Sequence, residues 1–85
     1  MNLTECKPGD KVKVIYLSAG ISVRSKLSKM NIKEDSILEV IAHQPWNGPI
    51  TVKVGNSKQT IGRGLSMKII CEPVNGIEDT PKSST

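Results

Sequence analysis

Aromatic side chains are almost absent from this sequence. The 85 residues contain one tryptophan, one tyrosine and no phenylalanine, so aromatics make up 2% of the chain. Proteins that read single-stranded nucleic acid stack bases on several exposed aromatic rings. The composition therefore argues against that mode of recognition. It also requires a core built from aliphatic side chains.

Residues suited to catalysis or metal binding are scarce. The chain has one histidine, His43, and two cysteines, Cys6 and Cys71, which lie near opposite ends. A zinc site needs four ligands at short, paired spacings, and these residues do not offer them. We interpret both cysteines as small apolar core residues and His43 as a surface residue. No nucleophile–base set can be assembled, so we expect no catalytic residue, no cofactor, no metal ligand and no enzymatic activity.

Long hydrophobic runs are also missing. No apolar stretch approaches the roughly 18 residues needed to cross a bilayer. Residues 1–5 lack the basic and apolar regions of a signal peptide. We therefore expect a cytoplasmic protein without a membrane span. With 36% hydrophobic and 24% charged residues, the composition is that of one small globular domain.

Positive charge is concentrated in the first part of the chain. Residues 1–33 carry seven basic and two acidic side chains, a net charge of +5, whereas residues 34–85 carry −1. A basic face favours an acidic partner, an anionic membrane surface or a phosphate backbone. The alternative, equally open at this point, is that the lysines keep a small protein soluble.

Alternation of apolar and polar residues predicts five short strands. They are expected at residues 11–17, 37–43, 50–54, 57–61 and 67–72. In the first of them the pattern shifts at Ile15, which indicates either coverage of both faces or a β-bulge. Between the strands, Lys7-Pro8-Gly9-Asp10 predicts a type II turn, and residues 62–66 predict a corner or a single helical turn.

One short helix is predicted over residues 22–30. Val23, Leu27 and Met30 lie at positions i, i+4 and i+7, which places them on one apolar stripe. Ser22 is the expected N-cap, since its hydroxyl can accept from a free amide of the first turn. So short a helix is unstable alone, and we expect the stripe to be packed against the sheet.

The end of this helix is also encoded locally. Asn31 tolerates the left-handed conformation that the position after the C-cap requires, and Ile32 can then contact Leu27. This sequence predicts a Schellman-type stop.

The elements together predict a mainly β protein in which five strands close into a small barrel, with the helix after the first strand. We place the domain at residues 1–72. Residues 73–85 are polar, without periodicity, and we expect them to form a disordered C-terminal tail.

Trp46 stands out from the rest of the sequence. It lies in a loop, residues 44–49, flanked by two prolines. Tryptophan is over-represented among binding hot spots. The alternative, given equal weight, is that the ring folds back over the end of the barrel and covers apolar side chains.

Taken in order, these elements resemble the ferrous iron transport protein A (FeoA) family and its SH3-like barrel domain. The resemblance covers about 70 residues, from Leu3 to Glu72. It is carried by five fragments, each weak alone: Leu3-x-x-Cys6-Lys7-Pro8-Gly9-Asp10, Lys26-Leu27-x-x-Met30-Asn31-Ile32, Asp35-x-x-Leu38-x-Val40, Pro45-Trp46-Asn47-Gly48-Pro49-Ile50 and Arg63-x-x-Ser66-x-x-Ile69-x-Cys71. Asn31 and Asp35 stand where the family often has glycine, and both tolerate a left-handed backbone. Cys6 and Cys71 replace aliphatic residues, which favours their interpretation as core residues.

The resemblance implies a non-enzymatic accessory protein of ferrous iron uptake. Its expected partner is the cytoplasmic GTPase region of a FeoB-type membrane transporter, which it would modulate. We expect the contact surface to include Trp46 together with the basic flank of the helix: Arg24, Lys26 and Lys29.

Two other functions are compatible with the sequence. The domain also resembles the C-terminal SH3-like module of metal-dependent repressors, and a basic SH3-like barrel can bind nucleic acid. The aromatic shortage and the mild charge make nucleic acid the weaker alternative. A weak homo-oligomer is also compatible with the sequence.

Overall fold

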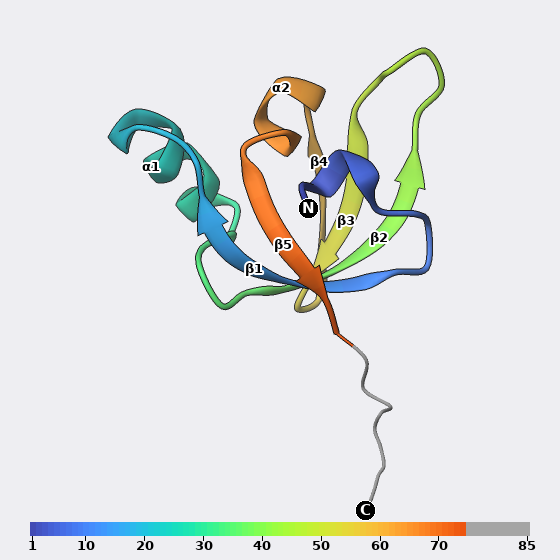
Figure 1. Ribbon diagram of the computed structural model, residues 1–85, viewed down its shortest axis with the longest axis horizontal. Coiled ribbons are helices and arrows are strands. Elements are labelled where there is room, and N and C mark those ends of the chain that lie inside the picture. Colours follow the sequence, from blue (N-terminus) through green and yellow to red (C-terminus); the bar gives the residue numbers. More distant parts are fainter. Residues whose placement is uncertain (75–85) are drawn as a thin grey trace, which may run out of the picture.

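The computed structural model describes residues 1–74 of the chain. A five-stranded antiparallel sheet with the order β4-β3-β2-β1-β5 forms its centre (Figure 1). The strands are β1 (Lys11–Leu17), β2 (Ile37–His43), β3 (Ile50–Val54), β4 (Ser57–Ile61) and β5 (Ile69–Pro73). A 3₁₀ turn η1 (Leu3–Glu5) precedes them, α1 (Ile21–Lys29) follows β1, and α2 (Arg63–Ser66) precedes β5. The mainly β fold with a helix after the first strand is thus confirmed.

The two edge strands of the curved sheet, β5 and β4, differ in how far other parts of the chain cover them. Strand β5 is covered along part of its outer edge by the N-terminus, because the Cys71 amide donates to the Met1 carbonyl at 2.8 Å and Asn2 bridges to Ile70. Strand β4 forms the other edge. Within residues 1–74 no ladder joins β4 to β5, so backbone hydrogen bonds leave the small barrel open between these two strands. The short elements α2 and η1 lie over the opening instead (Figure 1).

The core is aliphatic, as the shortage of aromatics requires. Alternate residues of the central strands point inward and are buried, among them Val12, Val14, Leu38, Val40 and Val52. The two cysteines lie in the same cluster, which confirms their interpretation as core residues.

A β-bulge in β1 adjusts which residues reach the core. The pairing of β1 with β5 shifts register between Val14 and Tyr16. The extra residue, Ile15, leaves both Ile15 and Tyr16 exposed and brings Leu17 back to the buried face. The bulge indicated by the sequence pattern is confirmed.

Helix α1 begins one residue earlier than predicted, and its expected cap is wrong. Gly20, not Ser22, is the N-cap residue, and no side chain caps this end. The reason is local: the Arg24 amide donates to the Gly20 carbonyl at 3.0 Å, which closes the first turn around Ile21 and Ser22. Ser22 is therefore an exposed residue inside the helix.

The C-terminal end of α1 matches the prediction. The Ile32 amide donates to the Leu27 carbonyl, and the Asn31 amide donates to that of Ser28, both at 2.9 Å. Asn31 has φ +62°. This is the hydrogen-bond pair of a Schellman motif. Leu27 and Ile32 are fully buried, so the stripe of the helix is packed as expected.

The last strand starts two residues later than predicted. Met67 and Lys68 still belong to the turn that closes α2, because their amides donate to Arg63 and Leu65 at 3.0 Å. The helical turn expected near residues 62–66 is confirmed, whereas η1 was not anticipated. The domain also extends past residue 72, since the Val74 amide donates to the Lys11 carbonyl at 2.8 Å. The rest of the predicted tail, residues 75–85, lies outside the described residues.

Candidate functional site

Trp46 lies at the tip of the connection between β2 and β3. Its indole is 95% exposed, so the alternative in which it covers the barrel end is wrong. Trp46 and Asn47 have φ +61° and +58°, and the Gly48 amide donates to the Pro45 carbonyl at 3.1 Å. Positive φ at both central positions makes this a type I′-like turn.

The turn that carries Trp46 is tightly built. The Gln44 amide donates to the Pro49 carbonyl at 3.0 Å, which closes the base of the loop. A Cβ atom at Gly48 would lie 2.9 Å from the Gln44 Cβ and 3.0 Å from the Pro45 carbonyl oxygen, so glycine is required there. A bulky residue in the left-handed region costs about 1–2 kcal/mol. The fold thus holds a large apolar ring in solvent on a constrained turn.

The three predicted basic residues of α1 have different surroundings. Lys26 and Lys29 are exposed, and neither of the two ion pairs within residues 1–74 involves them. Arg24 is tied to the fold: its Nη1 donates to the Leu17 carbonyl at 3.1 Å, and its Nη2 lies 3.2 Å from Glu34 Oε2. Arg24 therefore anchors the helix, and the free charge of the flank comes from Lys26 and Lys29.

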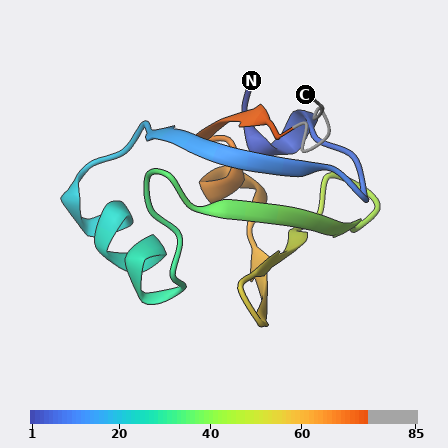
Figure 2. The same ribbon diagram turned by 90° about the horizontal axis from the view of Figure 1, so that it is seen from below.

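The structure does not bring Trp46 and the helix together. Helix α1 lies at one end of the molecule, and the β2–β3 connection lies at the other, in both Figure 1 and Figure 2. One compact contact patch cannot include both. The predicted surface is therefore two surfaces: the Trp46 turn and the α1 flank.

The remaining reactive side chains are packed inside the fold. The sulfur atoms of Cys6 and Cys71 lie 3.8 Å apart, both buried and both free thiols. Burial raises the pKa of Cys6 to about 12 and also raises the pKa of Cys71. Both are therefore protonated at neutral pH, a form in which they do not ligate metals. Among residues 1–74, no group of three or more His, Cys, Asp and Glu side chains is placed to hold a metal ion.

His43 is less exposed than the sequence indicated. It pairs with Ile50 near the end of β2 and is half-buried. Its Nε2 atom is buried and has no hydrogen-bond partner in the described structure. His43 is thus a partly covered residue at the surface, and among residues 1–74 it belongs to no group of candidate metal ligands.

Sequence reasoning missed one feature: a row of charged residues across the outer face of the sheet. Lys11 on β1 is paired with Glu39 on β2, Glu39 with Lys53 on β3, and Lys53 with Lys58 on β4. The polar positions of each strand were visible in the sequence. Their alignment was not, because it depends on the register between strands.

No helix among residues 1–74 has both the length and the apolar character needed to span a bilayer.

Comparison with known proteins places these features in a family. Over 70 residues the chain is 40% identical to a provisionally named Fe(2+) transport protein A of Methanocaldococcus jannaschii, covering 82% of this chain and 83% of the relative. It is similar to a crystal structure of an iron uptake regulatory protein (FeoA), with TM-score 0.82 and 31% identity over 87% of this chain and 97% of that one. It is also similar to the solution structure of iron(II) transport protein A from Clostridium thermocellum, with TM-score 0.84 and 26% identity over 89% of this chain. The chain spans 47% of that protein.

The fold is shared more widely. A manganese-dependent transcriptional repressor superimposes with TM-score 0.80 over 87% of this chain and 36% of its own, at 24% identity. That level of identity shows the SH3-like fold alone. The FeoA domain model matches residues 1–73, in agreement with the five sequence fragments, and the chain belongs to the FeoA domain family.

Proposed function

We propose that this protein is a non-enzymatic accessory of ferrous iron uptake, which binds the cytoplasmic GTPase region of a FeoB-type membrane transporter and modulates it. Membership of the FeoA domain family and the 40% identical Fe(2+) transport protein A relative support a role in iron transport. Iron is the cargo of the transporter in this proposal, and the accessory acts through protein contact.

One observation carries the proposal that the contact is made by the Trp46 turn. Trp46 is 95% exposed and lies on a backbone with φ +61°. Neither property stabilises the fold: the ring buries no surface, and the backbone is strained by about 1–2 kcal/mol. A partner pocket that accepts the indole would bury a side chain of the type that dominates interface hot spots.

The α1 flank has a second and separate role in the proposal. Lys26 and Lys29 are exposed in the last turn of α1. Helix α1 itself lies at the other end of the molecule from the β2–β3 connection (Figure 1). Exposed charges at a distance from the anchor accelerate the encounter with an acidic surface and add little to the final affinity. Their contribution is screened by salt.

A binding measurement on the full chain tests the proposal. The purified GTPase region of a FeoB-type transporter is titrated with the protein at physiological salt, and a random-sequence DNA duplex is titrated in parallel. We expect saturable binding to the GTPase region and weaker binding to DNA. Stronger binding to DNA, or no binding to the GTPase region, would overturn the proposed function.

The charge variant separates the two surfaces. Lys26→Glu combined with Lys29→Glu should slow association, most strongly at low salt, while the dissociation rate changes little. A matched control with the same change in charge is Lys7→Glu combined with Lys68→Glu, which alters exposed lysines outside α1. An equal loss in both variants would mean that net charge, and not the α1 flank, steers the encounter.

A further inference from the structure

The outer face of the sheet carries a row of charges that the Trp46 turn and the α1 flank do not include. Residues directly opposite each other in neighbouring strands project from the same face. The register of the strands therefore aligns four side chains across β1, β2, β3 and β4: Lys11, Glu39, Lys53 and Lys58. Their neighbours in each strand, such as Val12, Leu38 and Val52, point inward and are fully buried. We call this set the outer lysine row.

The charges of the outer lysine row are not balanced within the described fold. Lys53 and Lys58 are directly opposite each other, an arrangement of like charges that destabilises a strand pair. Glu39 lies between Lys11 and Lys53, so one carboxylate faces two ammonium groups. Neither of the two ion pairs within residues 1–74 involves a member of the row.

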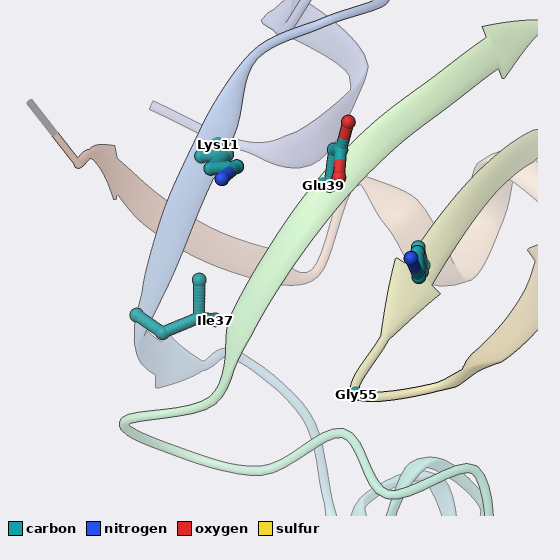
Figure 3. Close-up of a pocket in the computed structure, with 5 residues that line it drawn as sticks. Lys11, Ile37, Glu39 and Gly55 are labelled. Atoms are coloured by element: carbon teal, nitrogen blue, oxygen red, sulfur yellow. The ribbon is translucent and has the colours of Figure 1, made fainter. Parts of the chain in front are cut away.

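A surface hollow lies beside this row. It is lined by Lys11, Ile37, Glu39, Lys53 and Gly55. Figure 3 shows Lys11 on β1 beside Glu39 on β2, with Ile37 further along β2 and Gly55 at the turn after β3. Ile37 is 46% exposed and supplies an apolar wall. The hollow therefore combines two unpaired ammonium groups with one aliphatic contact.

We propose that the outer lysine row and this hollow bind an extended acidic segment of a partner protein, with an aliphatic side chain on Ile37 and carboxylates on the lysines. In an extended segment alternate side chains point the same way at a spacing of about 7 Å, and strands β1 and β3 are about 10 Å apart. Carboxylates at positions i and i+4, about 13 Å apart, can therefore reach the flexible ends of Lys11 and Lys53, while an aliphatic side chain at i+2 faces Ile37 and Glu39.

The chemistry of the face favours a peptide over nucleic acid. A nucleic acid carries a negative charge at every nucleotide, so one that contacted both Lys11 and Lys53 would also place a phosphate near the carboxylate of Glu39. The row also lacks an aromatic ring on which a base could stack. A peptide segment can place a neutral side chain opposite Glu39 and an aliphatic one in the hollow.

This inference does not depend on the proposed function, because it uses a different surface and a different probe. The probe is a short synthetic peptide in which glutamate, valine and glutamate occupy every second position with serine between them, and its control has glutamine in place of glutamate. Amide NMR shifts of the full chain are followed during titration. We expect salt-sensitive binding of the acidic peptide, with the largest shifts at Lys11, Ile37, Glu39 and Lys53, and at least about tenfold weaker binding of the control.

Matched variants locate the site. Lys53→Glu combined with Lys58→Glu should weaken binding by about tenfold or more, whereas Lys26→Glu combined with Lys29→Glu, with the same change in net charge, should stay within about twofold. Lys53→Gln serves as a control for misfolding of the β3–β4 hairpin, because it removes one positive charge without adding a negative one. Its loss of peptide affinity should lie between those of the two double variants. Equal losses in the two double variants, or shifts confined to α1, would overturn the inference.

The same titration tests two other occupants of this face: the C-terminal segment of this chain and a single-stranded nucleic acid. If Glu78→Gln combined with Asp79→Asn raises peptide affinity by about tenfold, the C-terminal segment of this chain is the occupant, and the proposal of a partner segment is overturned. If a single-stranded DNA displaces the acidic peptide at equal concentration, the face is a nucleic-acid site, and the proposal is overturned in the same way.

Discussion

The sulfur atoms of Cys6 and Cys71 are 3.8 Å apart in the buried core, although 65 positions separate the two residues in the chain. Cys6 follows η1, and Cys71 lies in β5, so their contact joins the start of the chain to its last strand. Both thiols are shielded from water, and this raises their pKa values: that of Cys6 moves from 9.0 to about 12.

This shielding predicts a loss of stability at alkaline pH. Between pH 9 and about 12 the unfolded chain releases the Cys6 proton while the folded chain keeps it. Stability from this group is therefore complete below pH 9 and falls by about 1.4 kcal/mol per pH unit above it. Urea unfolding of the wild type and of Cys6→Ala at a series of pH values isolates the effect, because the two proteins differ only at this thiol. Parallel stability curves above pH 9 would contradict it.

Leu27 should be the most sensitive position of α1. It is fully buried, and its carbonyl receives the Ile32 amide at the helix end. Leu27→Ala is expected to lower the free energy of unfolding by about 2–5 kcal/mol. Ser25→Ala, an exposed change on the same helix, should alter it by no more than about 0.5 kcal/mol. Similar values for the two variants would mean that the helix does not pack through Leu27.

Arg24 should act as a structural anchor more than as a partner contact. Arg24→Ala removes the hydrogen bond to the Leu17 carbonyl and the ion pair with Glu34. It should cost about 2 kcal/mol, since a charged donor to a carbonyl is lost. Glu34→Gln removes only the half-exposed ion pair and should cost about 0.5 kcal/mol. Equal costs in chemical denaturation would assign the stabilisation to the ion pair instead.

The isolated protein should not bind ferrous iron tightly. Among residues 1–74 no three candidate ligands are grouped, and the two thiols are buried and protonated at neutral pH. Anaerobic calorimetric titration with ferrous iron is expected to show no stoichiometric, sub-micromolar isotherm. Such an isotherm, abolished by Cys6→Ser or Cys71→Ser, would refute this prediction.

Local sequence signals predicted most of the fold. The Asn31–Ile32 stop, the bulge near Ile15 and the turn at Gly9 all depend on residues within a few positions of one another. The N-terminal end of α1 was misplaced because no side chain caps it. The Gly20 carbonyl accepts from the Arg24 amide and closes the first turn, and a rule based on capping side chains does not identify such a start.

The candidate site was predictable as a set of residues and not as an arrangement. The proline-flanked loop singled out Trp46, yet its exposure follows from the left-handed turn at Trp46 and Asn47, where glycine or asparagine is the usual choice. The separation of Trp46 from α1 depends on the strand order. The outer lysine row depends on the register between neighbouring strands. Register is set by the geometry and length of the connecting turns as well as by hydrophobic alternation, so alternation alone did not predict the row.

Trp46 supplies the central test of the proposed function. Asparagine tolerates the left-handed backbone that tryptophan strains, so Trp46→Asn should leave the protein as stable as the wild type or more stable by about 1 kcal/mol. The decisive measurement is the affinity of this variant for the GTPase region of a FeoB-type transporter, compared with the wild type at physiological salt. If the indole anchors the contact, the variant should bind about thirtyfold more weakly, equivalent to about 2 kcal/mol. Undiminished affinity in a fully folded Trp46→Asn variant would contradict the account.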